Sequence, residues 1–209
     1  NRIYTPGDVK IDLMSRRDAV HATLDGGDFH LSTAFNSSVN QLTENGMRIY
    51  KTIRKQLTDR RIDQPAIIRQ LPSGHFTLRS GRNNLLSNLL AQDGYAFSQA
   101  DINLTSSPQK GLDGYISVDS LVYNDIHIDS IRADLTSVDG QVNYKLSVAN
   151  NPNNSYPYHG YLQGILYEHG LQTHATILDN NGKKGFDLAV QAAMKGRGIQ
   201  LSITSPQSI

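Results

Sequence analysis

Apolar and polar residues alternate at every second position through most of the chain from residue 111 to residue 206. Successive side chains of a β-strand point to opposite faces, so this period gives each strand one apolar face and one polar face. Short polar or glycine-containing turns separate the runs, which is typical of a meander of antiparallel strands. The predicted strands cover residues 114–123, 126–136, 141–149, 158–167, 171–179, 184–194 and 199–205.

The first hairpin of this region has a register that its turn predicts. Asn124 and Asp125 suit a two-residue turn because both residue types tolerate positive φ. The resulting cross-strand pairs are all apolar, namely Tyr123 with Ile126, Leu121 with Ile128, Val118 with Ile131 and Ile116 with Ala133. In both strands the apolar residues change between even and odd positions, and the change falls at the same level of the hairpin. Either each strand carries a bulge there, or the apolar face changes sides of the sheet. We favour the bulges, which would sharpen the twist.

The N-terminal part predicts three more strands, at residues 8–14, 19–25 and 29–35, followed by helices. Apolar residues recur every three or four positions from Val39 to Leu57, which predicts a long amphipathic helix capped by Ser37 or Ser38. Shorter helices are predicted near Asp63 and at residues 83–92, with a strand at residues 75–80 between them. We expect the helices to cover an apolar edge or an open end of the sheet.

The composition favours a thin structure rather than a dense globule. Apolar residues make up 38% of the 209 residues, aromatic residues 7%, and Trp is absent, whereas a globular chain approaches half apolar residues. The expected organisation is a β-meander at 1–36, a helical insert at 37–93 and a second β-meander at 94–209. We expect these parts to form one continuous unit cut from a longer chain.

Several classes of function find no support in the residues. A net charge of +1 gives no reason to expect nucleic acid as a partner, and the absence of cysteine excludes disulfides and thiolate zinc sites. No nucleophile elbow, P-loop or dinucleotide motif is present. We therefore expect no enzyme activity and no cofactor.

Three weaker patterns have simple alternative interpretations. His169 and His174 lie near one turn, but solvent-facing positions explain them, as they explain the other histidines. The aspartates at 119, 125, 129, 134 and 139 do not follow a calcium-loop pattern, so no metal site is predicted. The long helix carries a basic face that could dock on anionic lipid, although a solvated face is the simpler interpretation. That basic face consists of Arg48, Lys51, Arg54 and Lys55.

The β-meander resembles a known family. The run Gly-Leu-Asp-Gly-Tyr-Ile-Ser-Val-Asp-Ser-Leu from Gly111, the run Asn-Asp-Ile-His-Ile-Asp-Ser-Ile from Asn124 and the final Gly-Ile-Gln-Leu-Ser-Ile from Gly198 are similar to TamB and its AsmA-like relatives. The opening Tyr-Thr-Pro-Gly-Asp-Val from Tyr4 and the helical insert resemble TamB versions from Bacteroidetes. The resemblance covers nearly the whole chain, as an internal or C-terminal-side segment.

This resemblance implies a fold, a location and a function. The fold would be mainly β with a helical insert (α+β), a long antiparallel β-meander curled into an elongated groove. Proteins of this kind span the periplasm of Gram-negative cells from an inner-membrane anchor. They are linked to phospholipid transport to the outer membrane, with acyl chains as ligand, and to outer-membrane protein assembly with an Omp85-type barrel partner.

The groove lining would be the apolar set of each strand. The candidates are Ile116, Val118, Ile131, Ala133, Val142, Tyr144, Leu146, Val148, Phe186, Leu188, Val190, Ala192, Ile199, Leu201 and Ile203. In strand 158–167 the phase is ambiguous, because Leu162 and Leu166 compete with Tyr161 and Ile165. A packed core remains an alternative to a groove. Alternative functions are a scaffold that offers strand edges to outer-membrane proteins and a secreted β-sandwich that binds carbohydrate.

Overall fold

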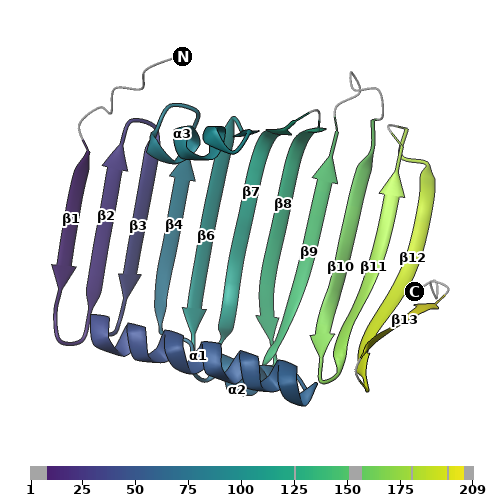
Figure 1. The fold of residues 1–209 in the computed structure, drawn as a ribbon, viewed down its shortest axis with the longest axis horizontal. Helices are drawn as coiled ribbons and strands as arrows, with labels where there is room; N and C mark the ends of the chain where they lie inside the picture. The colour runs from purple at the N-terminus through teal and green to yellow at the C-terminus, as the bar shows by residue number, and fades with distance from the viewer. Residues whose placement is uncertain (1–8, 125, 151–156, 180, 197, 205–209) are drawn as a thin grey trace.

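The computed structural model describes residues 9–124, 126–150, 157–179, 181–196 and 198–204. Within these residues the chain forms one antiparallel sheet of 13 strands whose order follows the sequence, with β5 beside the end of β7 (Figure 1). The elements in order are β1 (Lys10–Ser15), β2 (Val20–Gly26), β3 (Phe29–Phe35), α1 (Val39–Asp59), α2 (Gln64–Ile68), β4 (Gly74–Ser80), α3 (Leu85–Gln92), β5 (Tyr95–Ala96), β6 (Gln99–Ser107), β7 (Gly111–Tyr123), β8 (Ile126–Val138), β9 (Gln141–Ala149), β10 (His159–Tyr167), β11 (Gly170–Leu178), β12 (Lys184–Lys195) and β13 (Gly198–Thr204).

The helices lie where the sequence predicts them, although α3 begins at Leu85, two residues after the predicted start. Ser38 caps α1 in a capping box with Gln41, and the helix ends at Arg60 in a left-handed conformation. Asp63 caps α2 by accepting a hydrogen bond from the backbone of Ala66, and Asn84 caps α3. The predicted helices between residues 37 and 93 are thereby confirmed.

The register of the β7–β8 hairpin is also confirmed. All four predicted pairs are present, and the pairing of Val118 with Ile131 fixes the register of the whole hairpin. The ladder is interrupted between the Asp119–Ser130 and Leu121–Ile128 pairs, where Ser120 has a positive φ of 52°. Each strand has one residue between these two pairs, so the numbers of residues in the two strands stay equal. The irregularity therefore affects both strands alike and is not a single bulge, which would add a residue to one strand only. Asn124 has positive φ, whereas Asp125 lies outside the described residues, as do the opening motif up to residue 8 and the loop at 151–156.

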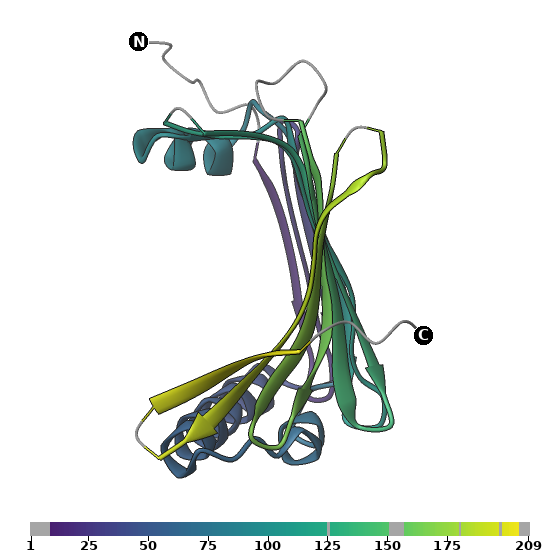
Figure 2. The same cartoon turned by 90° about the vertical axis from the view of Figure 1, so that its right-hand side faces the viewer.

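α1 and α3 lie on the same side of the sheet at opposite ends of its strands, and α2 lies at the strand ends beside α1 (Figure 2). α1 and α2 run along one end and α3 lies at the other, where the far end of β7 bends toward it. Of the two predicted positions, an edge or an open end of the sheet, the helices take the second, because the edge strands are β1 and β13 and the helices lie at the strand ends. Polar groups at the strand ends explain the observed position: the Gln64 side chain accepts a hydrogen bond from the backbone N–H of Val142 and donates one to the carbonyl of Leu166.

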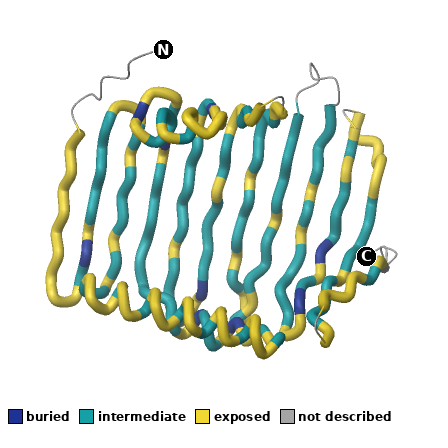
Figure 3. The backbone as a smooth tube through the Cα atoms, viewed as in Figure 1, coloured by how far each residue is buried: buried dark blue, intermediate teal, exposed yellow. Residues whose placement is uncertain are grey.

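The molecule is thin, and little of it is buried. Its accessible surface is 14112 Å², whereas a compact protein of 23.1 kDa would expose about 9,700 Å². Val20, Ile68 and Phe97 are the buried apolar residues among those described. Figure 3 shows the same pattern, with most strand positions half-buried. The sheet is open and carries no second layer within the described residues.

Two glycines give a matched test of this packing. A Cβ at Gly164 would lie 2.1 Å from the Gln172 carbonyl oxygen, whereas a Cβ at Gly46 in α1 meets nothing within 4 Å. We expect Gly164→Ala to lower the free energy of unfolding by roughly 1–3 kcal/mol through backbone displacement. Gly46→Ala should raise it by roughly 0.5–1 kcal/mol. Urea denaturation measures both, and equal effects of the two substitutions would contradict the close approach of β10 and β11.

Candidate functional site

One face of the sheet carries a continuous row of apolar side chains across the strands. Each residue of the row is the cross-strand partner of the next, so all lie on the same face. From β1 to β12 the row is Ile11, Leu24, Leu31, Leu78, Ile102, Ile116, Ala133, Leu146, Leu162, Ala175 and Leu188. We call the side of the sheet that bears this row the apolar face.

The lining residues predicted from the sequence fall on this face. Leu146 pairs with Ala133 and Leu162, Tyr144 with Leu135 and Gly164, and Val190 with Ile203. The remaining candidates occupy the same phase of their strands: Ile116, Val118, Ile131, Val142, Val148, Phe186, Leu188, Ala192, Ile199 and Leu201. The ambiguous strand is also settled, because Leu162 joins the apolar row and Tyr161 points to the other face.

The structure extends the face over strands from which the sequence nominated no lining residue. Leu24, Leu31, Phe76, Leu78, Ile102 and Leu104 on β2, β3, β4 and β6 continue the same rows. Their period-two alternation was visible in the sequence. Only the cross-strand pairing shows that their apolar phase matches that of β7.

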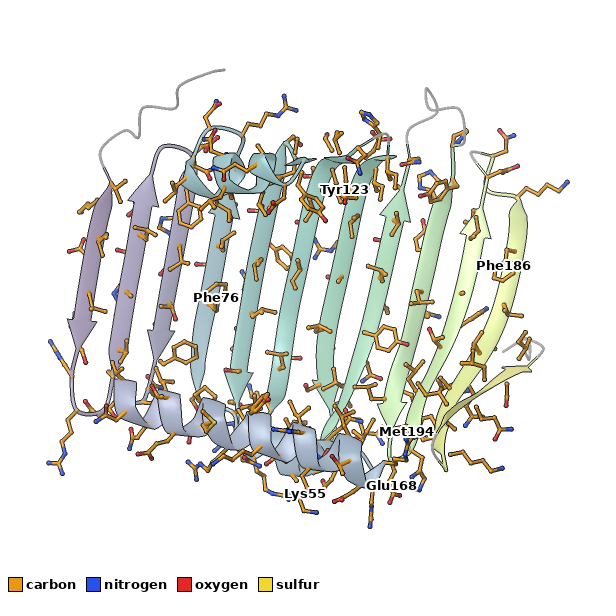
Figure 4. All side chains as sticks on the ribbon, in the orientation of Figure 1. Lys55, Phe76, Tyr123, Glu168, Phe186 and Met194 are labelled. Carbon is orange, nitrogen blue, oxygen red and sulfur yellow. The ribbon has the colours of Figure 1, made fainter. Side chains whose placement is uncertain are left out.

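The apolar face is open to solvent. Phe76 and Phe186 project on the side of the sheet where α1 lies (Figure 4). Ile116, at the centre of the sheet, is 38% exposed, and Leu201, near its edge, is 69% exposed. Neighbouring side chains on one sheet cover each other's flanks but leave their tips uncovered. A packed core would need a layer over these tips, and the described residues supply none.

Helix α1 contacts the rest of the protein through a largely polar row, which is unusual for an amphipathic helix. Its half-buried positions are Leu42, Asn45, Ile49, Thr52 and Gln56. Gln56 exchanges two hydrogen bonds with the backbone of Asp63, and Thr52 pairs with the side chain of Gln70. Polar contacts thus help to hold the helix in place together with Leu42 and Ile49, and the other apolar residues of α1 remain exposed.

Five apolar residues of α1 are exposed, and four of them, Val39, Tyr50, Ile53 and Leu57, form a stripe, with Met47 further round the helix. Tyr50 is 58% exposed and Leu57 is 59% exposed. At 3.6 residues per turn the stripe lies about 100° around the helix from the half-buried row. α1 runs along the lower strand ends from β2 toward β10, with α2 beside it and α3 at the other end of the strands (Figures 1 and 2). The half-buried row hydrogen-bonds Asp63 and Gln70 near α2, so the right-handed turn of the helix directs the stripe toward α3 along the apolar face.

The opposite end of the apolar face has apolar side chains of its own. Leu85 and Leu89 of α3 are exposed, and the rings of Tyr95 and Tyr123 stack with centroids 4.3 Å apart. Asn84 anchors this helix by donating hydrogen bonds from its amide to Asp28 and to the Ser80 hydroxyl. The apolar face is thus bordered at both strand ends by helices that expose apolar residues.

The other face of the sheet is polar and internally paired. Arg79 and Asp101 form an ion pair at 2.8 Å, and the Arg132 guanidinium lies 4.3 Å from the centre of the Tyr115 ring. Partial burial raises the pKa of Asp101, but hydrogen bonds from Arg79 and Gln99 outweigh it and lower that pKa overall. A hollow of about 290 Å³ that is lined by Arg79, Asp101 and Tyr115 among others lies here. Its charged residues already satisfy one another, and the site candidates lie on the other face.

The described residues give no sign of a metal site or of a membrane-crossing helix. Within them, no three His, Asp or Glu side chains lie close enough to share a metal ion. His174 instead hydrogen-bonds Asp187, and Asp134 pairs with Arg132. None of the helices in the described ranges has the length and apolar character needed to span a bilayer.

Comparison with known proteins adds no identification. The chain matches no family model, no curated protein and no solved structure. The geometry of the two faces is therefore the evidence on which a function rests.

The polar face yields a prediction for acid pH. Hydrogen bonds from Lys184 and then from His174 lower the pKa of Asp187 from 3.8 to about 2. A carboxylate whose pKa falls on folding adds stability above pH 3.8 and loses that contribution as the pH falls toward 2. We expect Asp187→Asn to flatten the acid limb of the stability curve in this range. Thermal melts between pH 2 and pH 6 test this, and identical curves would contradict it.

Proposed function

We propose that this chain shelters the acyl chains of phospholipid on its apolar face, as a segment of a TamB- or AsmA-like protein. The observation that carries the proposal is the uncovered apolar row that runs from β1 to β12. In this proposal the sheet and its bordering helices act as an elongated groove. The groove has the sheet as its floor, α1 on one side and α3 on the other.

The extent of the apolar face supports a ligand. Neighbouring strands lie about 4.8 Å apart and alternate residues of a strand about 6.7 Å apart, so three apolar rows across the sheet cover on the order of 1,000 Å². The largest apolar patch of an ordinary monomer is about 300–600 Å². An uncovered face of this size needs an apolar partner.

An acyl chain meets this need without any catalytic group. Transfer of each CH₂ from water to the face is favourable by roughly 0.8 kcal/mol. The contacts are non-directional, so a chain can slide along a row from one strand to the next at little cost. That behaviour suits conduction better than tight, fixed binding. The proposed path lies between the inner and outer membranes, and its phospholipid cargo follows from the family resemblance.

Arginine substitutions on the apolar face test the proposal. Val190 is half-buried and Leu201 is exposed, so an arginine at either position can reach water and the fold should survive. The added charge on the apolar face would however obstruct acyl chains. We expect the double variant Val190→Arg/Leu201→Arg to bind 1-lauroyl-lysophosphatidylglycerol at least about fivefold more weakly, as measured by isothermal titration calorimetry.

The neighbouring positions on the polar face provide the control. Gln191→Arg/Gln200→Arg adds the same charge on the same two strands but on the opposite face. It should leave binding unchanged, and thermal melts should show both variants folded. Unfolding of the apolar-face variant alone would mean that this face is a packed core, and equal binding by both variants would refute the groove.

A second candidate function is a scaffold for assembly of outer-membrane proteins with an Omp85-type partner. The observation that favours it is that β1 and β13 end the strand order and pair on one side only within the described residues. Free strand edges accept further strands through backbone hydrogen bonds. Such pairing would tolerate arginine on the apolar face, so the same variants separate the two functions. The β-sandwich alternative does not fit the single sheet of the described residues.

A further inference from the structure

The surface of α1 has a third part, beyond its half-buried row and its apolar stripe. At about 100° per residue, Arg54 and Lys51 follow the stripe on the side away from the sheet. Arg48 and Lys55 lie further round, on the side of the helix away from the apolar face. Lys55 points away from the sheet at the outer side of α1 in Figure 4. The four cations together span about 120° of the helix circumference, with Arg54 nearest the stripe and Arg48 and Lys55 farthest from it.

The four cations also differ in whether their side chains have a partner within the described residues. The Arg48 guanidinium donates a hydrogen bond to the Asn45 side chain, and Lys55 forms an ion pair with Asp59. The side chains of Lys51 and Arg54 have no hydrogen bond or ion pair with any residue in the described part of the chain. Both are exposed. Arg54 thus borders the apolar stripe and Lys51 lies about 60° further round the helix, and neither side chain is committed to a partner in the described residues.

We propose that Lys51 and Arg54 bind the phosphate of an amphiphile whose acyl chain lies on the stripe of α1. The inference rests on the proposed function and adds the chemistry of the head group to it. Three residues of helix span about 4.5 Å, so both side chains can reach one phosphate. Arginine offers a planar fork and lysine a mobile point charge, and both form charge-assisted hydrogen bonds with phosphate oxygens.

The position of the pair relative to the stripe explains how head group and chain would be separated. Ile53 and Tyr50 lie next to Arg54 and Lys51 in sequence, with their side chains turned toward the apolar face. A phosphate bound at the pair would stay in water at the margin of the sheet, while the chain would enter the face. The proposed substrate class is therefore a phosphate-bearing amphiphile, in preference to a neutral lipid of the same chain length.

The test compares two amphiphiles with the same acyl chain. The probes are 1-lauroyl-lysophosphatidylglycerol, which has a phosphate, and 1-monolauroylglycerol, which has none, both below their micelle-forming concentrations. We expect Lys51→Gln/Arg54→Gln to weaken binding of the first about tenfold and to leave binding of the second unchanged. The control Arg48→Gln/Lys55→Gln removes the same charge from the outer side and should change neither. Thermal melts verify that both variants are folded.

The outcomes separate the head-group site from the groove. If wild-type protein binds both amphiphiles and Lys51→Gln/Arg54→Gln changes neither affinity, the phosphate site is wrong and the groove stands. An equal loss in the control variant would also overturn the site, because it would show a general effect of charge. If wild-type protein binds neither amphiphile, the proposed function fails and the phosphate site fails with it.

Discussion

The backbone hydrogen-bond ladder is the interaction on which this molecule depends. A single sheet without a second layer buries few side chains, so the ladder and the same-face side-chain pairs must hold the strands together. The close backbone approaches at Gly114, Gly164 and Gly170 fit this picture, because a Cβ at any of them would lie about 2 Å from a carbonyl oxygen of the neighbouring strand. The stabilising contacts are thus spread along the sheet, and they do not require the apolar face to be buried.

Directed hydrogen bonds also hold the helices in place. Asn84 fixes α3 through the turn region that contains Asp28, Gln64 fixes α2 to β9 and β10, and Gln56 with Thr52 fixes α1 to α2. An amphipathic helix ordinarily docks with its apolar stripe, because burial of that stripe is the main favourable term. Here directed hydrogen bonds position the helices at the strand ends. The apolar stripe of α1 remains available, and it borders the apolar face of the sheet.

The two faces of the sheet therefore have separate roles. The polar face satisfies its charges through cross-strand pairs such as Arg79 with Asp101, which keeps it hydrated. The apolar face has no such partners and no covering layer within the described residues. In the proposed function an acyl chain is that layer, and the cations of α1 lie where its phosphate would meet water. The cost of an exposed apolar face is then offset whenever lipid is bound.

The sequence by itself determined the local structure. Period-two alternation set the strands, the turn at Asn124 set the register of the β7–β8 hairpin, and Ser38, Asp63 and Asn84 set the helix starts, because each of these signals acts over a few neighbouring residues. Only the tertiary structure decided where the helices lie and which apolar rows join across the sheet. The sequence also could not predict which way the apolar stripe of α1 faces. That direction depends on hydrogen bonds of Gln56, Thr52 and Gln70, which link segments that sequence periodicity does not relate. The continuity of the apolar face likewise arises from pairing between strands, and a one-residue slip between any two of them would have broken it.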